Sequence, residues 1–569
     1  MKGNFTRDTF DPARHFTRVL MQQGRVQLDA DWNEQNSILL HYIRTLIADF
    51  IGQHGGPAGN CGFGIITPAD SAIIKKDLQT SGFLIGRGHY YVDGILCEND
   101  YSTSYFRQKD LPPPQSLENG TYVVYLDVWE RHVTYVEDEY IREVALRGPD
   151  TATRAKVVWQ VKVYRMPGEQ VKITCTLPDS KDFWKLSNVT LRAIAKQDKL
   201  PTEACSVSPE ARYRGAENQL YRVEVHRPGT AWDGRGPTLN KGAAVAARVI
   251  MENTNKAPLA ASEARVTVLR STEGPQLTDR ATSEISPQPA GGAINNAPAT
   301  FKWSRENGSV VFPIIDASHD SSNNTVVSLA HLGRDEKLSL AIGDWVELID
   351  DDYVLLNKAE PLLQVLQVDR NEMKVTLSGP ASITASSEFL DKHPLVRRWD
   401  QKKGDVKKGG LEMGSDNAAM IVEGTGETNW LTLEDGVQIQ FQSPAGGQYR
   451  TGDYWLIPAR TATGNVEWPK DKNEPRFLAP HGVVHHYAPL ATIDVSVPKG
   501  GVNPEVSNVH DCRNVIDLAA PGKQADGPIS IAISPSFGPI GTSVNVLGSG
   551  FPGYTEVTIE IDGKPLAKV

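Results

Sequence analysis

Cysteine is scarce in this sequence, and its few cysteines follow no familiar spacing. The chain has 569 residues but only five cysteines, and no two of them form a CxxC pair. A small odd number of scattered cysteines argues against a disulfide framework and against a cysteine zinc site. We therefore expect buried thiols in a reducing compartment for all five: Cys61, Cys97, Cys175, Cys205 and Cys512.

Long apolar runs are also missing. A cleavable signal peptide needs an apolar run of about 7–15 residues near the N-terminus, and a membrane-spanning helix needs about 18 or more. The most apolar stretch, residues 38–51, is interrupted by His41, Arg44 and Asp49. We therefore predict no membrane span and synthesis in the cytoplasm, with release only by a dedicated export route or by cell lysis.

Signatures of common catalytic sites are absent as well. The sequence contains no GxxxxGK[ST] phosphate loop, no GxSxG elbow and no HExxH helix. The formal net charge of −10 argues against a broad phosphate-binding surface. We therefore predict no catalytic residues, no cofactor-binding residues, no cofactor and no nucleic-acid partner.

The composition is that of a large globular protein. Hydrophobic residues make up 40% of the chain and charged residues 22%. The 49 glycines and 36 prolines suit turn-rich β structure, and the length suits about three or four domains of ~150 residues. We predict a mainly β, multidomain chain of β-sandwich and β-barrel modules, with one N-terminal amphipathic helix; the resemblance described below implies a C-terminal immunoglobulin-like segment.

Helical periodicity is clearest near the N-terminus. From Trp32 to Phe50, apolar residues recur at spacings of three, four and seven, which puts them on one broad helix face. Asp29 and Asp31 suit the first turn, so the helix should begin near Asp31 or Trp32. Gly52 and the following Gly-Gly-Pro turn should end it.

Strand patterns dominate the rest of the chain. Residues 90–96 read as a hairpin around Asp93-Gly94, and Asn307-Gly308 gives a second hairpin signal. Residues 343–350 resemble the opening strand of a small β-barrel, and 189–195 fit either a strand or a helix. Further strands are predicted within residues 122–129, 132–136, 157–164, 222–226, 299–304, 362–377, 429–442 and 453–458.

Changes in amino-acid composition along the chain suggest where its domains begin and end. An irregular Gly, Ala, Thr and Pro-rich stretch interrupts two β-rich regions, and a linker-like stretch follows the second. The predicted segments are an arm and helix at 1–55, a β-rich domain at 56–228, an insertion at 229–298, a second β-rich region at 299–497, a linker at 498–527 and an immunoglobulin-like piece at 528–569.

The densest group of metal-ligand residues is a histidine cluster. His481, His485 and His486 fall within six residues, and imidazoles in such a group bind zinc, copper or iron when they converge. On a strand, however, His481 and His485 share one face while His486 points to the other. At most two ligands then converge, so we assign no metal site here and keep the three histidines as weak candidates.

The N-terminal stretch carries a family resemblance. Gly24-Arg25-Val26-Gln27 runs into Asp31-Trp32-Asn33-Glu34 at the helix start. This pattern resembles the start of an uncharacterised family encoded among contractile injection systems and phage-tail-like clusters. It is similar, more loosely, to the attachment region of baseplate-bound phage tail fibres. Further islands that resemble this family lie at residues 90–94, 301–308, 452–460 and 485–491.

The C-terminal segment carries a second resemblance. Ser534 to Pro539, Gly541 to Val546 and Gly548 to Phe551 look like the opening half of an immunoglobulin-like TIG domain. A sandwich of this type usually has about 80–100 residues. We therefore expect the native protein to continue past residue 569.

Together the resemblances imply a structural, fibre-like or baseplate-associated component of a particle, which mediates assembly or contact with a target surface. The implied partners are other baseplate or sheath-associated proteins, the chain itself as a homotrimer, and a cell-surface glycan. The implied location is cytoplasmic during assembly, then particle-associated or extracellular. The residues expected to bind partners are Arg25, Leu28, Trp32, Asn33 and Glu34.

Two other functions stay open. A carbohydrate-binding or carbohydrate-cleaving surface protein would need an exposed aromatic groove flanked by two carboxylates. A metal-dependent enzyme would need the cluster from His481 to His486 to hold a stoichiometric ion.

Overall fold

A computed structural model gives the fold of the chain. It describes all residues except the following ranges: 68–81, 112–115, 147–149, 167–174, 178–186, 197–211, 233–297, 382–386, 405–408, 499–503, 518–529, 535–544, 550–557, 562–563 and 569. The expected insertion at 229–298 lies almost wholly outside the described residues.

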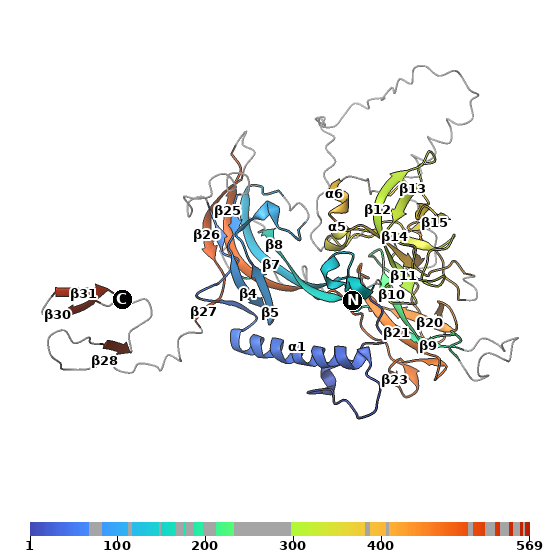
Figure 1. Cartoon of the computed structure of the whole chain (residues 1–569), viewed down its shortest axis with the longest axis horizontal. Helices are drawn as coiled ribbons and strands as arrows, with labels where there is room; N and C mark the ends of the chain where they lie inside the picture. The colour runs from blue at the N-terminus through green and yellow to red at the C-terminus, as the bar shows by residue number, and fades with distance from the viewer. Residues whose placement is uncertain are drawn as a thin grey trace, which may run out of the picture.

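The described chain is mainly β, as predicted, and forms several sheets above one long helix (Figure 1). The first β unit is a pair of four-stranded sheets, ordered β27-β1-β4-β5 and β26-β25-β7-β8, with the small sheet β2-β3-β6. Its strands are β1 (His54–Pro57), β2 (Ile65–Ile66), β3 (Leu84–Ile85), β4 (Gly88–Val92), β5 (Ile95–Asn99), β6 (Thr103–Ser104), β7 (Gly120–Val133), β8 (Arg154–Arg165), β25 (His486–Ser496), β26 (Glu505–Asp511) and β27 (Val515–Ile516).

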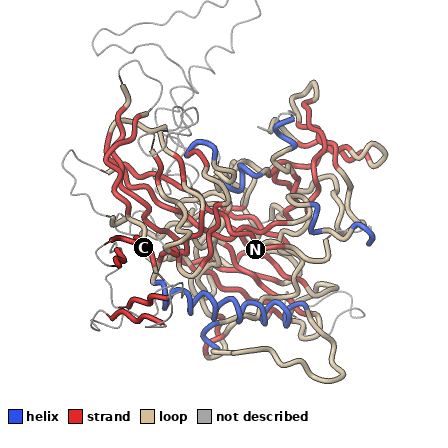
Figure 2. The backbone as a smooth tube through the Cα atoms, turned by 60° about the vertical axis from the view of Figure 1, so that its left-hand side comes forward, coloured by secondary structure: helices blue, strands red, loops and turns tan. Residues whose placement is uncertain are grey.

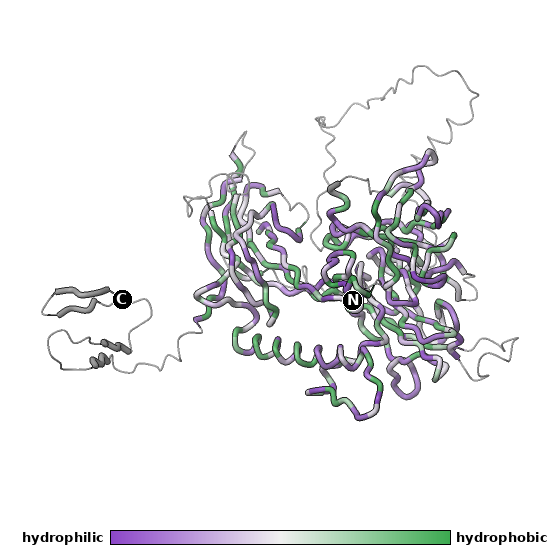
Figure 3. Tube along the Cα trace, viewed as in Figure 1, coloured by the Kyte–Doolittle hydropathy of each residue, from purple (hydrophilic) through white to green (hydrophobic). Residues whose placement is uncertain are grey.

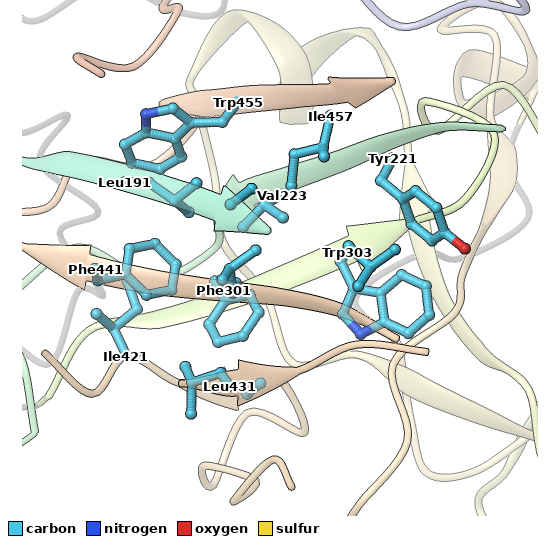
Figure 4. Close-up of a cluster of buried hydrophobic side chains, with 14 of the residues drawn as sticks. Leu191, Tyr221, Val223, Phe301, Trp303, Ile421, Leu431, Phe441, Trp455 and Ile457 are labelled. Carbon is cyan, nitrogen blue, oxygen red and sulfur yellow. The ribbon is translucent and has the colours of Figure 1, made fainter. Parts of the chain in front are cut away.

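The second β unit packs a five-stranded sheet, ordered β18-β11-β10-β21-β22, with the three-stranded sheet β19-β20-β9. Aromatic and branched side chains from both sheets fill the space between them, including Phe301, Trp303 and Phe441 (Figure 4). Its strands are β9 (Thr190–Ala195), β10 (Gln219–Val225), β11 (Thr300–Ser304), β18 (Ala419–Met420), β19 (Leu431–Thr432), β20 (Val437–Gln442), β21 (Tyr454–Arg460) and β22 (Asn465–Val466).

A closed six-stranded barrel, ordered β12-β13-β16-β15-β14-β17, lies beside the second unit. The barrel expected around residues 343–350 is confirmed, although β14 is the third of its strands along the chain and not the opening one. Its strands are β12 (Val311–His319), β13 (Thr325–Leu329), β14 (Trp345–Ile349), β15 (Leu363–Asp369), β16 (Lys374–Leu377) and β17 (Leu395–Trp399).

The two dipeptide turn signals had different outcomes. Asp93 and Gly94 both adopt positive φ, 46° and 77°, and join β4 to β5 in the predicted hairpin. Asn307 and Gly308 also have positive φ, 51° and 65°, but the hairpin prediction there is wrong. β11 pairs with β10 and β18, so this turn instead carries the chain from the second unit into the barrel.

The chain order differs from the predicted succession of domains. β9 and β10 lie within the stretch expected as the first domain but belong to the second unit, while β25 returns to pair with β7. The stretch 498–527, expected as a linker, contains β26 and β27, which pair with β25 and β1. The expected break between two strands at 122–136 is also absent, because β7 runs unbroken for 14 residues.

The N-terminal helix α1 spans Asp29–Ile51. It begins two residues earlier than Asp31, and the carboxylate of its first residue, Asp29, accepts hydrogen bonds from the backbone and hydroxyl of Thr6, at 2.9 and 2.5 Å. It ends before Gly52, as predicted, and Gly52 has the positive φ that a helix C-terminus favours. The backbone trace shows α1 lying along the outside of the β units (Figure 2).

The remaining elements are short. They are the 3-10 turns η1 (Pro12–Arg14), η2 (Tyr105–Arg107), η3 (Glu139–Ile141) and η4 (Val144–Leu146), the helices α5 (Asp351–Leu355) and α6 (Ser387–Leu390), and the strands β23 (Lys470–Asp471), β24 (Glu474–Pro475), β28 (Ser530–Ser534), β29 (Asn545–Ser549), β30 (Thr558–Ile561) and β31 (Lys564–Lys568). In the expected immunoglobulin-like segment, β28 pairs with β29 and β30 pairs with β31.

One expectation about the cysteines is wrong. Cys175 and Cys512 form a disulfide across a sequence separation of 337 residues, while Cys61 and Cys97 are free thiols. No spacing rule reveals such a bridge, because only the tertiary fold brings residue 175 next to the end of β26. Cys205 lies outside the described residues.

Candidate functional site

Helix α1 leaves a large apolar surface uncovered. Of its 23 residues, only Ala30 and Ile38 are buried. Six large apolar side chains on it are about half exposed or more: Trp32 at 60%, Leu39 at 49%, Tyr42 at 49%, Ile43 at 53%, Leu46 at 56% and Phe50 at 77%. The apolar residues concentrate toward the carboxyl end of the helix (Figure 3). Such an exposed surface on a folded protein usually marks an interaction site.

Most of the exposed apolar residues lie in a narrow stripe with heptad spacing, and Leu40 and Tyr42, at 42% and 49% exposed, flank it. Taking Trp32 as position d, the a and d positions of the helix fall on residues 32, 36, 39, 43, 46 and 50. At 3.6 residues per turn these positions lie within a stripe about 80° wide. Five of the six are apolar and the sixth is Asn36. We call the stripe the α1 seam; it consists of Trp32, Asn36, Leu39, Ile43, Leu46 and Phe50.

The opposite side of α1 is fixed to the first β unit. Arg44 forms an ion pair with Glu130 on β7, with a shortest N–O distance of 2.8 Å. The β4–β5 turn lies directly against the helix backbone, because a Cβ on Gly94 would lie 2.2 Å from the carbonyl oxygen of Arg44. Glycine is therefore required at this turn by space as well as by its positive φ. The seam consequently faces away from the protein.

The N-terminal arm, residues 1–28, packs against the first turns of α1. The Thr9 hydroxyl donates to Glu34 at 2.5 Å, and the Val19 amide donates to the Gln35 side chain at 2.8 Å. Between arm and helix lies a cleft of about 200 Å³. It is lined by Phe10, Asp11, Pro12, His15, Phe16, Glu34, Ile38, His41 and Tyr42.

The start of the arm is held by a buried charged cluster, which comprises Lys2, Arg222, Glu224, Lys302 and Glu347. Lys2 pairs with Glu224 at 3.0 Å, and Lys302 pairs with Glu347 at 2.5 Å. Arg222 pairs with Glu224 at 2.5 Å and donates to the carbonyl of residue 1 at 3.2 Å. The cluster thus joins the arm, strands β10 and β11 of the second unit, and strand β14 of the barrel.

Opposite charges keep both carboxylates of the cluster ionised. Burial alone would raise the pKa of Glu347, but the charges of Lys302, His226 and Lys2 together outweigh it and lower the pKa to about 2. For Glu224 the effect of burial is likewise outweighed, by Lys2 and Arg222, and its pKa lies well below the usual value. Sequence reasoning missed this cluster because its members come from four distant segments with no local motif.

The structure places the five predicted partner-binding residues in different surroundings. Arg25, Leu28, Trp32 and Asn33 are exposed. Glu34 instead faces the arm, bonds to Thr9 and lines the cleft. Of the five, only Trp32 belongs to the α1 seam.

The three candidate histidines do not converge on one point. The His485 ring bonds to Asp127 at 2.6 Å, and the His486 ring bonds to Asp93 at 2.8 Å. His481 packs its ring against Tyr454 at a centroid distance of 5.5 Å. Within the described residues, the one group of three close metal-ligand side chains is elsewhere, at Cys175, His510 and Cys512.

Two further observations bear on the alternatives. Trp32 is the only tryptophan in the described ranges that is mostly exposed, and it does not line the cleft between the arm and α1, which contains the carboxylates of Asp11 and Glu34. None of the helices that the structure describes has the length and apolar character of a membrane span.

Comparison with known proteins places the chain in one family. The profile of a family of unknown function, DUF6519, matches residues 1–182, 184–257 and 281–540. Because these ranges cover most of the chain, the protein belongs to this family. No curated protein and no solved structure matches it significantly.

Proposed function

We propose that this DUF6519 protein is a structural component of a contractile injection system or phage-tail-like particle, which it joins through α1. The observation that carries the proposal is the α1 seam, a heptad stripe of large apolar side chains that the chain's own β units leave uncovered. Burying one Leu or Ile side chain stabilises a complex by about 1.5–3 kcal/mol. A helix that keeps several such side chains exposed therefore gains binding free energy when it packs them against another helix.

The proposed occupant of the seam is α1 of further copies of this chain. Heptad a and d positions are the pattern by which like helices pack knobs into holes. Asn36 then fits as the single polar position that fixes register, because it bonds to its counterpart in the neighbouring helix. Ile43 at a and Leu39 at d favour two strands, whereas the fibre resemblance implies three. The β units would lie outside this bundle, free for contacts with the particle or its target.

The first test is the native mass of the full chain by light scattering. We expect a multiple of the chain mass for the wild type and a monomer for the double variant Leu39→Gln/Ile43→Gln. A matched control is Tyr140→Gln/Leu146→Gln, because these residues are 100% and 63% exposed but lie away from α1. A wild-type monomer at high concentration, or a variant that stays associated, would refute the pairing.

The second test concerns the particle itself. Particles purified from a strain that carries the seam variant should lack the protein, while the control variant should copurify with them. Retention of the seam variant on particles would refute attachment through α1. Absence of the wild-type protein from every particle preparation would refute the particle role while leaving self-association intact.

A further inference from the structure

Two cysteine side chains, joined as a disulfide, and one imidazole meet at the edge of the first β unit. His510 is the sixth residue of edge strand β26, and Cys512 follows its last residue by one. The Cys512 amide still donates to the carbonyl of Leu490 at 2.9 Å, so the chain is extended there. Residues two apart on an extended strand share a face. The third residue, Cys175, approaches from a segment 337 residues away.

The ligand atoms of these residues converge. One sulfur from each cysteine and one ring nitrogen of His510 all lie within 4.8 Å of one another. The His510 ring makes no hydrogen bond to any of the residues that the structure describes, and it is exposed. The nearby carboxylate of Asp511 is bonded to Arg513, with the shortest distance 2.6 Å. The imidazole is therefore free to act as a ligand, while Asp511 is occupied.

We propose that Cys175, His510 and Cys512 form a zinc site once a dithiol reductant has reduced the disulfide to two thiols, the reductant giving up two electrons and two protons and becoming a disulfide itself. Thiolate and imidazole are the ligands that zinc prefers in proteins, in a tetrahedral arrangement with Zn–S near 2.3 Å and Zn–N near 2.0–2.1 Å. Three protein ligands leave the fourth position for water. Binding releases one proton from each thiol, and two thiolates neutralise the divalent charge.

The same three residues therefore have two exclusive states. With the disulfide formed, the sulfurs are bonded to each other and give no thiolate ligands. With the cysteines reduced, zinc takes over the connection between the segment at residue 175 and strand β26. The proposal is independent of α1 and of the proposed particle role.

The test uses the reduced full chain and Co²⁺ as a spectroscopic stand-in for Zn²⁺. After complete reduction and removal of metal, Co²⁺ should bind with one equivalent per chain and give a thiolate-to-cobalt charge-transfer band. Zn²⁺ should then displace it and abolish the band. The oxidised chain should give no such band.

Variants locate the site. Cys512→Ser should abolish the charge-transfer band, and His510→Ala should weaken Co²⁺ binding by about tenfold or more. Cys61→Ser and His481→Ala are matched controls, because Cys61 is a free thiol and His481 belongs to the other histidine group. His510→Ala also keeps both cysteines, so its intact disulfide after oxidation checks the fold. A reduced wild type without the band, or binding unchanged in His510→Ala, would overturn the site.

Discussion

Glu306 should make the protein less stable as the pH rises through neutrality. Its side chain is 11% exposed, and both carboxylate oxygens are buried without a hydrogen-bond donor among the described residues. The nearest cation is Arg398, at 3.6 Å. Burial and the neighbouring charge of Asp400 raise its pKa from 4.5 to about 7, against the opposing effect of Arg398.

The sign follows from proton linkage. The folded state binds the Glu306 proton more tightly than the unfolded chain does, so this group's contribution is fully present below about pH 4.5 and is lost as the pH rises through about 7. Between these two pH values, each pH unit lowers the free energy of unfolding by about 1.4 kcal/mol. Ionisation therefore costs the folded protein about 3 kcal/mol by pH 8.

The substitution Glu306→Gln removes the ionisation and keeps the shape. Urea unfolding should show the variant and the wild type close together at pH 5, and the variant more stable by up to about 3 kcal/mol at pH 8. Glu372→Gln is the control, because Glu372 is 60% exposed and pairs with Lys374 on the surface. A variant that is destabilised equally at both pH values would refute the reasoning.

Three further predictions concern the contacts around the β units. Lys302→Met should lower the free energy of unfolding by about 3–5 kcal/mol because it removes the lysine that pairs with buried Glu347 and leaves this carboxylate with its neutral donors, Tyr353 and Trp399, close by. Adding Glu347→Gln should recover part of this loss in denaturant titrations. Lys162 and His485 outweigh burial and lower the pKa of Asp127, so the stability it contributes is present above its ordinary pKa of 3.8 and is lost as the pH falls. Melting curves from pH 3 to 7 should therefore be flatter for Asp127→Asn, and a wild-type slope in that variant would contradict this. Gly94→Ala should loosen α1 and speed amide hydrogen exchange along it, because the new methyl collides with the helix backbone; unchanged exchange would show that the turn can move aside.

Local patterns predicted the elements well. The 3.6-residue period gave α1 and its C-terminal end at Gly52, and the Asp93-Gly94 pair gave the β4–β5 hairpin. Both features depend on interactions between residues close in sequence. The ambiguous stretch at 189–195 forms a strand because β20 supplies its hydrogen bonds. That partner lies about 245 residues further along the chain, where local patterns do not reveal it.

Features built from distant segments could not be predicted in this way. The Cys175–Cys512 bridge, the return of β25 to β7 and the cluster around Glu224 each join parts of the chain separated by 200 residues or more. The same limit explains the error at Asn307-Gly308. A turn signal fixes the local backbone, but the pairing of the strands that follow depends on partners elsewhere.

Contacts around α1 hold the helix in one orientation, with its seam exposed. At its start, hydrogen bonds from Thr6 and Thr9 tie the helix to an arm that is itself anchored in the buried cluster through Lys2. Further along, Arg44 and Gly94 fix it to the first β unit. Because these contacts already fix the inner side of the helix, the seam points outward before a partner binds. Binding then loses little conformational entropy. Seam substitutions such as Ile43→Gln should therefore change association while leaving the unfolding of the isolated chain nearly unchanged. Loss of folding stability in such a variant, measured under monomeric conditions, would mean that the seam packs within the chain.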